Sequence, residues 1–142
     1  MVDEGLIRAR LKLLAEYISD LEGVQESDFA EFMENKVLRR FVERTLQLAI
    51  EACLDIGSHI ISSHGYREPQ YGRHVMDILA ENGWIDQDLR ESLVGMVGFR
   101  NILVHDYATI DPAIVFGVLR SRLPEIRSFG MSVLARMDRQ PS

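Results

Sequence analysis

The sequence predicts an all-α protein, an antiparallel bundle of about five helices. Apolar residues recur at steps of three and four along most of the 142 residues, a spacing that places them on one face of an α-helix. Gly, Pro and small polar residues separate these stretches at short intervals, and no stretch alternates like a half-buried strand. Short connections between amphipathic helices are typical of antiparallel bundles.

The first two predicted helices are the most regular in their spacing. The first spans Asp3 to about Leu21, and Gly23 is a plausible stop. Ser27 and Asp28 then offer an N-cap for a second helical stretch. Its apolar face continues through Leu38–Ile60, which predicts the longest helix of the chain.

Turn signals delimit the helices that follow. A loop rich in Gly, Pro and Ser is expected over residues 62–69. The next predicted helix covers Tyr71–Asn82, and Gly83 stands where a left-handed C-terminal residue belongs. Asp86 is a suitable N-cap for a further helix, which runs toward residues 100–107.

The last helix has both a start signal and a breaker. Asp111 and Pro112 provide an N-cap followed by a first-turn proline. The apolar spacing then continues from Ala113 to Met137, but Pro124 lies inside it, so a kink or break is expected near Leu123.

Length and composition indicate one globular domain over residues 1–142, frayed at 139–142. Sixteen basic against 22 acidic residues give a net charge of -6, which argues against broad attraction to nucleic acid and restricts any RNA contact to a local cleft. The single Cys53 excludes an internal disulfide. No targeting segment and no bilayer-length apolar run is evident. A cytoplasmic protein without membrane association is therefore expected.

Residues 100–107 combine a guanidinium, an imidazole and a phenol. Arg100 can grip phosphate oxygens and His105 can transfer protons near neutral pH. On a continuous helix, however, residues five apart point about 140° away from each other. Either the helix ends around Leu103, so that His105 swings back, or two copies of a homodimer pool these side chains. We expect both together.

The same residues also have a purely structural interpretation. An arginine near a helix end can satisfy carbonyl groups, and a histidine there can meet the negative end of the helix dipole. Because a short Arg and His spacing is common by chance, the spacing alone favours this interpretation.

Residues 100–107 resemble the Arg-x4-His-x-Tyr signature of HEPN-domain proteins, specifically of the HepT-like toxin family. The resemblance extends to the stretch 43–60, to Tyr71 and to residues 96–99, and so covers most of the chain from Val37 to Val115. It implies a helical-bundle ribonuclease that needs no metal and acts as a homodimer. In that interpretation His105 is the general base and Arg100 stabilises the phosphate in the transition state. Asn101 is a supporting residue that orients His105 or the phosphate, or else caps the helix end.

The resemblance also implies how such a toxin is neutralised. Related toxins form a type VII-like pair with a small nucleotidyltransferase antitoxin of the MntA kind, which transfers AMP from ATP to the tyrosine at the position of Tyr107. A bulky anionic nucleotide there would repel RNA from Arg100. ATP would be used by the partner, and this chain itself would need no cofactor.

Weaker candidates lie elsewhere in the chain. Arg44, Arg67 and Arg73 are candidate RNA contacts, because arginines cluster in the middle of the chain and aromatic residues interleave with the last two over 66–73. His59, His64 and His74 show no metal-binding spacing, so no metal is assigned. Two other functions remain open: a noncatalytic module that binds and regulates a nucleotidyltransferase, and a plain structural bundle.

Overall fold

The structure is a computed structural model that describes residues 3–139. Over this stretch it contains helices and no strand, as the sequence predicts. The elements are α1 (Glu4–Glu22), α2 (Phe29–Glu34), α3 (Lys36–His64), α4 (Gly72–Glu81), α5 (Gln87–His105), the 3-10 turn η1 (Tyr107–Thr109), α6 (Pro112–Ser121) and α7 (Leu123–Arg139).

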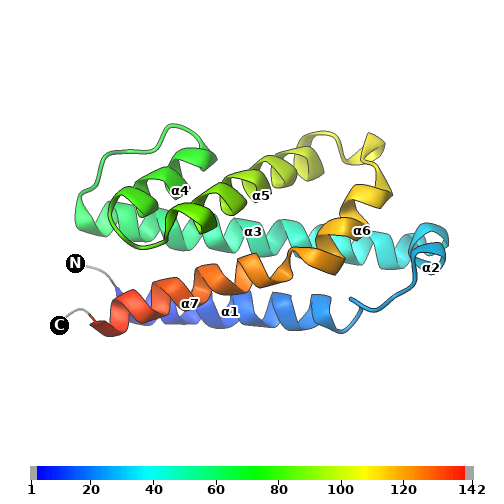
Figure 1. Ribbon diagram of the computed structural model, residues 1–142, viewed down its shortest axis with the longest axis horizontal. Helices are drawn as coiled ribbons and strands as arrows, with labels where there is room; N and C mark the ends of the chain where they lie inside the picture. Colours follow the sequence, from blue (N-terminus) through cyan, green and yellow to red (C-terminus); the bar gives the residue numbers. More distant parts are fainter. Residues whose placement is uncertain (1–2, 140–142) are drawn as a thin grey trace.

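Helix α3 is the centre of the bundle. It contacts each of the other α-helices, with α1 and α7 on one side and α4 and α5 on the other (Figure 1). Its buried residues extend from Val42 to Ile61, and Leu46, Ile56 and Ile60 are fully enclosed. The longest predicted helix is therefore also the core of the fold.

Helix α4 packs tightly against α3 at Gly57. A Cβ atom there would lie 2.5 Å from Val75 Cγ1 and 3.0 Å from Leu79 Cδ1. A larger residue here would therefore require the Val75 side chain or the helices to shift.

A break at Asn35 that the periodicity did not reveal, together with the break expected near Leu123, raises the number of helices above five. Asp28 caps only the short α2, because Asn35 adopts an extended backbone and its Oδ1 accepts a 3.0 Å hydrogen bond from the Leu38 N–H. Asn35 therefore starts α3 as a separate helix. At the other end of α3, the helix continues to His64, three residues into the predicted loop, and ends at Gly65 with φ 67°.

The other predicted boundaries agree with the structure. Asp3, Asp86 and Asp111 each accept a hydrogen bond from a first-turn N–H, and Gly83 has φ 77°. The break expected near Leu123 separates α6 from α7. Of the residues predicted to fray, Arg139 is the last of α7, and 140–142 lie outside the described residues. No helix within residues 3–139 is long and apolar enough to cross a bilayer.

Candidate active site at the α3–α5 seam

Arg100 of α5 is held against Glu51 of α3. Its Nε and Nη2 atoms donate to Glu51 Oε2 at 3.0 and 2.9 Å. Gln47, one turn earlier on α3, donates to the same oxygen at 3.2 Å. We call the line where α3 and α5 pack here the α3–α5 seam. Sequence analysis does not identify Glu51 as a site residue, because its pairing with Arg100 spans 49 residues.

Asn101 also contacts Arg100. Its Oδ1 accepts a 3.0 Å hydrogen bond from Arg100 Nη1, so in this structure it orients the guanidinium and not His105. A guanidinium has five N–H groups, of which Glu51 takes two and Asn101 one. Two N–H groups remain, one on each terminal nitrogen, and the side chain is partly exposed. Arg100 is therefore fixed in orientation yet still able to bind an anion.

His105 is the last residue of α5 and is exposed. No hydrogen bond, ion pair or ring contact joins it to any of the side chains or backbone groups that the structure describes. The expectation that the helix ends around Leu103 is wrong: Leu103 is buried, and the Asp106 N–H closes the last turn on the Ile102 carbonyl at 2.8 Å. His105 therefore stays about 140° around the axis from Arg100, and one chain does not bring the two together.

The chain turns sharply after His105. Asp106 is the exposed C-cap of α5, and its carbonyl accepts from the Thr109 N–H at 2.9 Å, which forms the 3-10 turn η1. The backbone of Tyr107 begins this turn, while its side chain lies outside the described residues.

A small cavity of about 250 Å³ lies between α3 and the end of α5. It is beside residues 100–107, which we call the motif. Glu43 lies in its wall, is only 8% exposed and accepts a 2.8 Å hydrogen bond from Arg40 Nη1. Leu103 and Val104 supply the α5 side. Arg44 also lines this cavity and is exposed, so a cationic side chain stands at the motif end of the seam.

The three arginines predicted as RNA contacts separate into two kinds. Arg67 donates two hydrogen bonds to Glu81, at 3.1 and 2.6 Å, and this contact lowers the pKa of Glu81 below its usual value. Its charge is thus compensated within the chain. Arg44 and Arg73 have no such carboxylate partner among the described residues.

The three histidines outside residues 100–107, to which the sequence assigns no metal, form no common cluster among the described residues. His64 packs on Tyr66 and Trp84, whereas His74 contacts Tyr71. Within the described residues no three His, Cys, Asp or Glu side chains form a group that could hold a metal ion.

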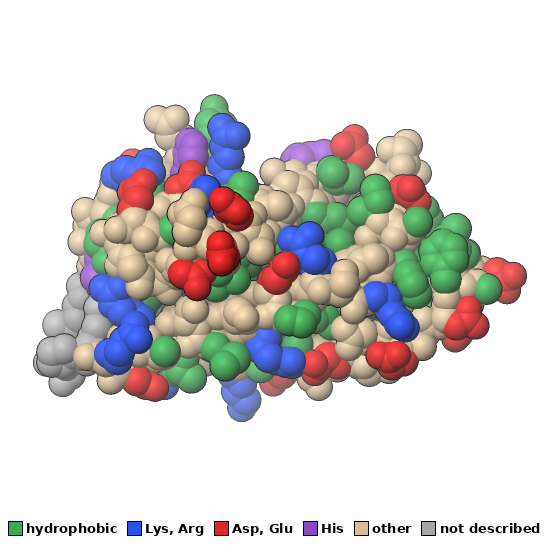
Figure 2. Space-filling model, in the orientation of Figure 1, with side chains coloured by type: hydrophobic (Ala, Val, Ile, Leu, Met, Phe, Trp, Pro, Cys, Tyr) green, Lys and Arg blue, Asp and Glu red, His purple; other side chains and the backbone are tan. Residues whose placement is uncertain are grey.

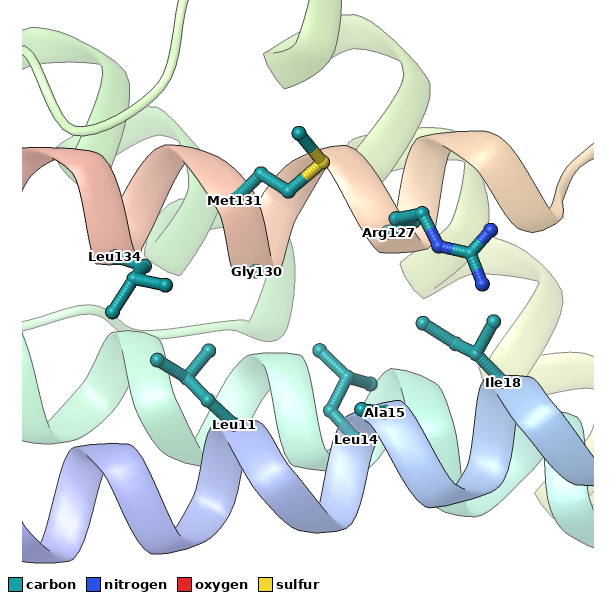
Figure 3. Close-up of a pocket in the computed structure, with 8 residues that line it drawn as sticks. All are labelled: Leu11, Leu14, Ala15, Ile18, Arg127, Gly130, Met131 and Leu134. Atoms are coloured by element: carbon teal, nitrogen blue, oxygen red, sulfur yellow. The ribbon is translucent and has the colours of Figure 1, made fainter.

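An apolar groove lies away from the seam, between α1 and α7 (Figure 3). Leu11 of α1 and Leu134 of α7 face one another across it, and Arg127 closes one end (Figure 3). It contains no residue of the motif and does not contribute to the candidate site.

Solved structures with the same fold include toxins bound to antitoxins. A crystal structure described as a toxin–antitoxin with AMP-PNP has a TM-score of 0.85 and 31% identity, and the match covers 92% of this chain and 98% of the other. A tri-AMPylated Shewanella oneidensis HEPN toxin in complex with MNT antitoxin also reaches 0.85, at 32% identity over 95% and 99% of the two chains.

Sequence comparisons agree with this likeness. The mRNA nuclease HepT of Shewanella oneidensis is 37% identical over 72% of this chain and 77% of its own. The tRNA nuclease HepT of Aphanizomenon flos-aquae is 27% identical over 81% and 78%. The profile of the family described as Ribonuclease HepT-like matches residues 14–133. This match covers most of the chain, and the chain therefore belongs to the HepT-like ribonuclease family.

Proposed function

We propose that this protein is a toxin endoribonuclease that cuts RNA without a metal ion, with Arg100 and His105 as its catalytic residues. The observation that carries this proposal is the anchored guanidinium of Arg100, which keeps two N–H groups for a ligand. The nuclease names of its relatives support the same reaction class.

The proposed reaction follows from these two side chains. Neutral His105 takes the proton of a ribose 2′-hydroxyl, and the 2′-oxygen then attacks the adjacent phosphorus. The bond to the 5′-oxygen breaks, and the imidazolium returns a proton to that oxygen. The products are a 2′,3′-cyclic phosphate and a 5′-hydroxyl. Arg100 binds the extra negative charge of the pentavalent phosphorane. DNA, which lacks the 2′-hydroxyl, is inert.

We propose a homodimer as the active form, because one chain leaves His105 and Arg100 on different sides of α5. Large apolar side chains are exposed around the motif end of the bundle: Phe29, Met33, Val37, Phe41, Ile102, Val104 and Ile114. Figure 2 shows apolar side chains gathered over α2 and α6 at this end. Exposed apolar surface of this kind marks an interface, and a second copy placed there would bring a second motif to the cleft.

Control of the enzyme is proposed to come from a nucleotidyltransferase antitoxin, as the complexes of similar toxins suggest. The Tyr107 oxygen would attack the α-phosphorus of ATP, lose its proton and release pyrophosphate. The AMP left on Tyr107 adds negative charge seven residues from Arg100 and repels RNA phosphates. ATP is a substrate of the partner. A cytoplasmic location, where ATP and RNA occur together, accords with the single buried Cys53.

The catalytic roles are tested with Arg100→Ala and His105→Ala. Each variant should lose RNA cleavage and growth arrest on expression without the antitoxin, while its circular dichroism and melting temperature stay close to wild type. Arg139→Ala, which removes another exposed arginine, is the matched control and should remain toxic. If purified wild-type protein fails to cut RNA, a noncatalytic module that binds the nucleotidyltransferase becomes the better description.

Modification is tested by intact mass. Incubation with the antitoxin and ATP should add one or more AMP units to wild type and none to Tyr107→Phe. Addition of AMP to the Phe variant would show that another residue is the acceptor.

A further inference from the structure

Most arginines of this chain donate to a neighbouring carboxylate or carbonyl oxygen, and the exceptions are few. Within residues 3–139, Arg44, Arg73 and Arg139 have neither a carboxylate nor a carbonyl partner, whereas each of the other arginines has one. In a chain with a net charge of -6, an uncompensated guanidinium is a local site for an anion.

Arg44 lies on the same face of α3 as the residues that hold Arg100. Arg44, Gln47 and Glu51 are spaced by three and four residues, so they share one side of the helix. Arg44 is two turns, about 10 Å, from Glu51 along the axis. It is exposed in the cavity bounded by Leu103 and Val104, and so stands on the His105 side of the Arg100 pair.

Arg73 stands on the other side of that pair. A Cβ atom on Gly72 would lie 3.0 Å from Val97 Cγ1 and 3.7 Å from Leu54 Cδ2, so the start of α4 rests on α3 and α5 at once (Figure 1). Leu54 follows Glu51 by one turn of α3, and Val97 precedes Arg100 by one turn of α5. Arg73, next to Gly72 and exposed, is therefore about one turn beyond the Arg100–Glu51 pair.

An exposed aromatic ring accompanies Arg73. Tyr71 is 65% exposed, and its ring meets His74 edge-on at 5.3 Å between centroids. The Gln70 N–H donates to His74 Nδ1 at 3.4 Å, which holds the imidazole in place. A supported, exposed ring beside a cation suits an unpaired base next to its phosphate.

We propose that the α3–α5 seam binds single-stranded RNA along its length. Arg44 and Arg73 hold backbone phosphates on opposite sides of the phosphate at Arg100, and Tyr71 stacks a base on the Arg73 side. Single-stranded RNA fits better than a duplex because a base must leave its neighbours to stack on Tyr71. This assignment rests on the proposed function, which places the cleaved phosphate at Arg100.

Binding is measured apart from cleavage, in a His105→Ala background. The probe is a fluorescein-labelled single-stranded RNA of about ten nucleotides, within the length that single-strand sites cover, and the readout is fluorescence anisotropy at several salt concentrations. Arg44→Ala and Arg73→Ala should each raise Kd about five- to tenfold. Each should also lower the steepness of log K against log salt by about 0.7.

The aromatic contact and the charge control use further variants in the same background. Tyr71→Ala should raise Kd about tenfold, and Tyr71→Phe, which keeps the ring, should bind as tightly as the parent. Arg139→Ala removes an equally uncompensated arginine at the end of α7 and should change neither Kd nor the salt dependence.

Two outcomes overturn the proposal: unchanged binding in the Arg44 and Arg73 variants, or an equal loss in Arg139→Ala. Cleavage by the Arg44→Ala and Arg73→Ala variants, made in protein that retains His105, distinguishes failure of the seam assignment from failure of the proposed function. If these variants cut RNA with unchanged KM, the seam assignment is wrong while the proposed function stands. If they lose binding as expected but wild type cuts no RNA, the seam assignment stands and the proposed function is wrong.

Discussion

At the scale of single residues, Arg100 is the most constrained group of the candidate site. A long, flexible arginine at a surface would sample many rotamers, and ordering it costs side-chain entropy. Here Glu51 and Asn101 hold three of its N–H groups before any ligand arrives. Preorganisation of this kind places a donor where charge develops in the transition state.

Glu51→Gln tests this positioning role. Glutamine retains the shape but loses the charge, so Arg100 should be held less firmly. We expect kcat for RNA cleavage to fall about tenfold, about 1.4 kcal/mol in the barrier, with little change in KM because the two outward N–H groups remain. Steady-state kinetics on an RNA oligonucleotide measure both constants.

Glu81→Gln is the matched control, since it weakens a similar arginine pair away from the seam. It should leave kcat unchanged. An unaltered kcat in Glu51→Gln, or a loss explained by a lower melting temperature, would contradict the positioning role.

Cys53 provides a second residue-scale prediction. It is 1% exposed inside α3, and burial raises the pKa of its thiol above the ordinary 9.0. A thiol reagent should therefore react with it only after unfolding. The folded state excludes the thiolate, so the stability that this group contributes is complete below about pH 9 and declines as the pH rises above it.

The pH dependence is checked by urea denaturation from about pH 8 to about pH 10. The free energy of unfolding should fall more steeply with pH in wild type than in Cys53→Ala, which lacks the titrating group. Equal slopes in the two proteins, or rapid labelling of native protein, would show that the thiol is accessible.

At the scale of elements, the close contact of α3 with α4 makes a stability prediction. Gly57→Ala places a methyl group 2.5 Å from Val75 Cγ1, so the Val75 side chain or the two helices must shift. We expect a loss of about 1–3 kcal/mol. Gly117→Ala is the control: nothing lies within 4 Å of its Cβ position, and alanine should stabilise α6 by about 0.5–1 kcal/mol. Urea denaturation measures the free energy of unfolding of both variants. Equal changes in the two would show that the close contact at Gly57 is not the source of the loss.

Element boundaries were predictable where a local signal exists. Asp86 and Asp111 cap their helices as expected, and Asp3, the predicted start of the first helix, is also its N-cap, because a side-chain oxygen two or three residues from an N–H is a purely local interaction. The break at Asn35 was not foreseen, since the apolar spacing runs on either side of it and asparagine also occurs inside helices. His105 remained in α5 because burial of Leu103 extends the helix.

At the scale of the whole molecule, the separation of Arg100 from His105 predicts complementation. Arg100→Ala and His105→Ala are each expected to be inactive alone. A heterodimer of the two contains one intact Arg100 and one intact His105 on facing chains. If the cleft pools residues from both copies, random mixing should restore about a quarter of wild-type activity.

The measurement is RNA cleavage after the two variants are unfolded together and refolded. Val104→Asp in both chains places a charge on the exposed apolar surface and should abolish both dimerisation and the restored activity. Mixed protein that stays inactive while dimeric by light scattering would contradict a pooled site.

The all-α class, most helix limits and residues 100–107 followed from the sequence alone, because periodicity, caps and short motifs depend on residues a few positions apart. The tertiary structure decided which charged side chains remain available to bind a ligand. It paired Arg100 with Glu51 across 49 residues, neutralised Arg67 with Glu81, and set Gly72 against Val97. Such contacts depend on which helix faces pack together, and no local pattern specifies them.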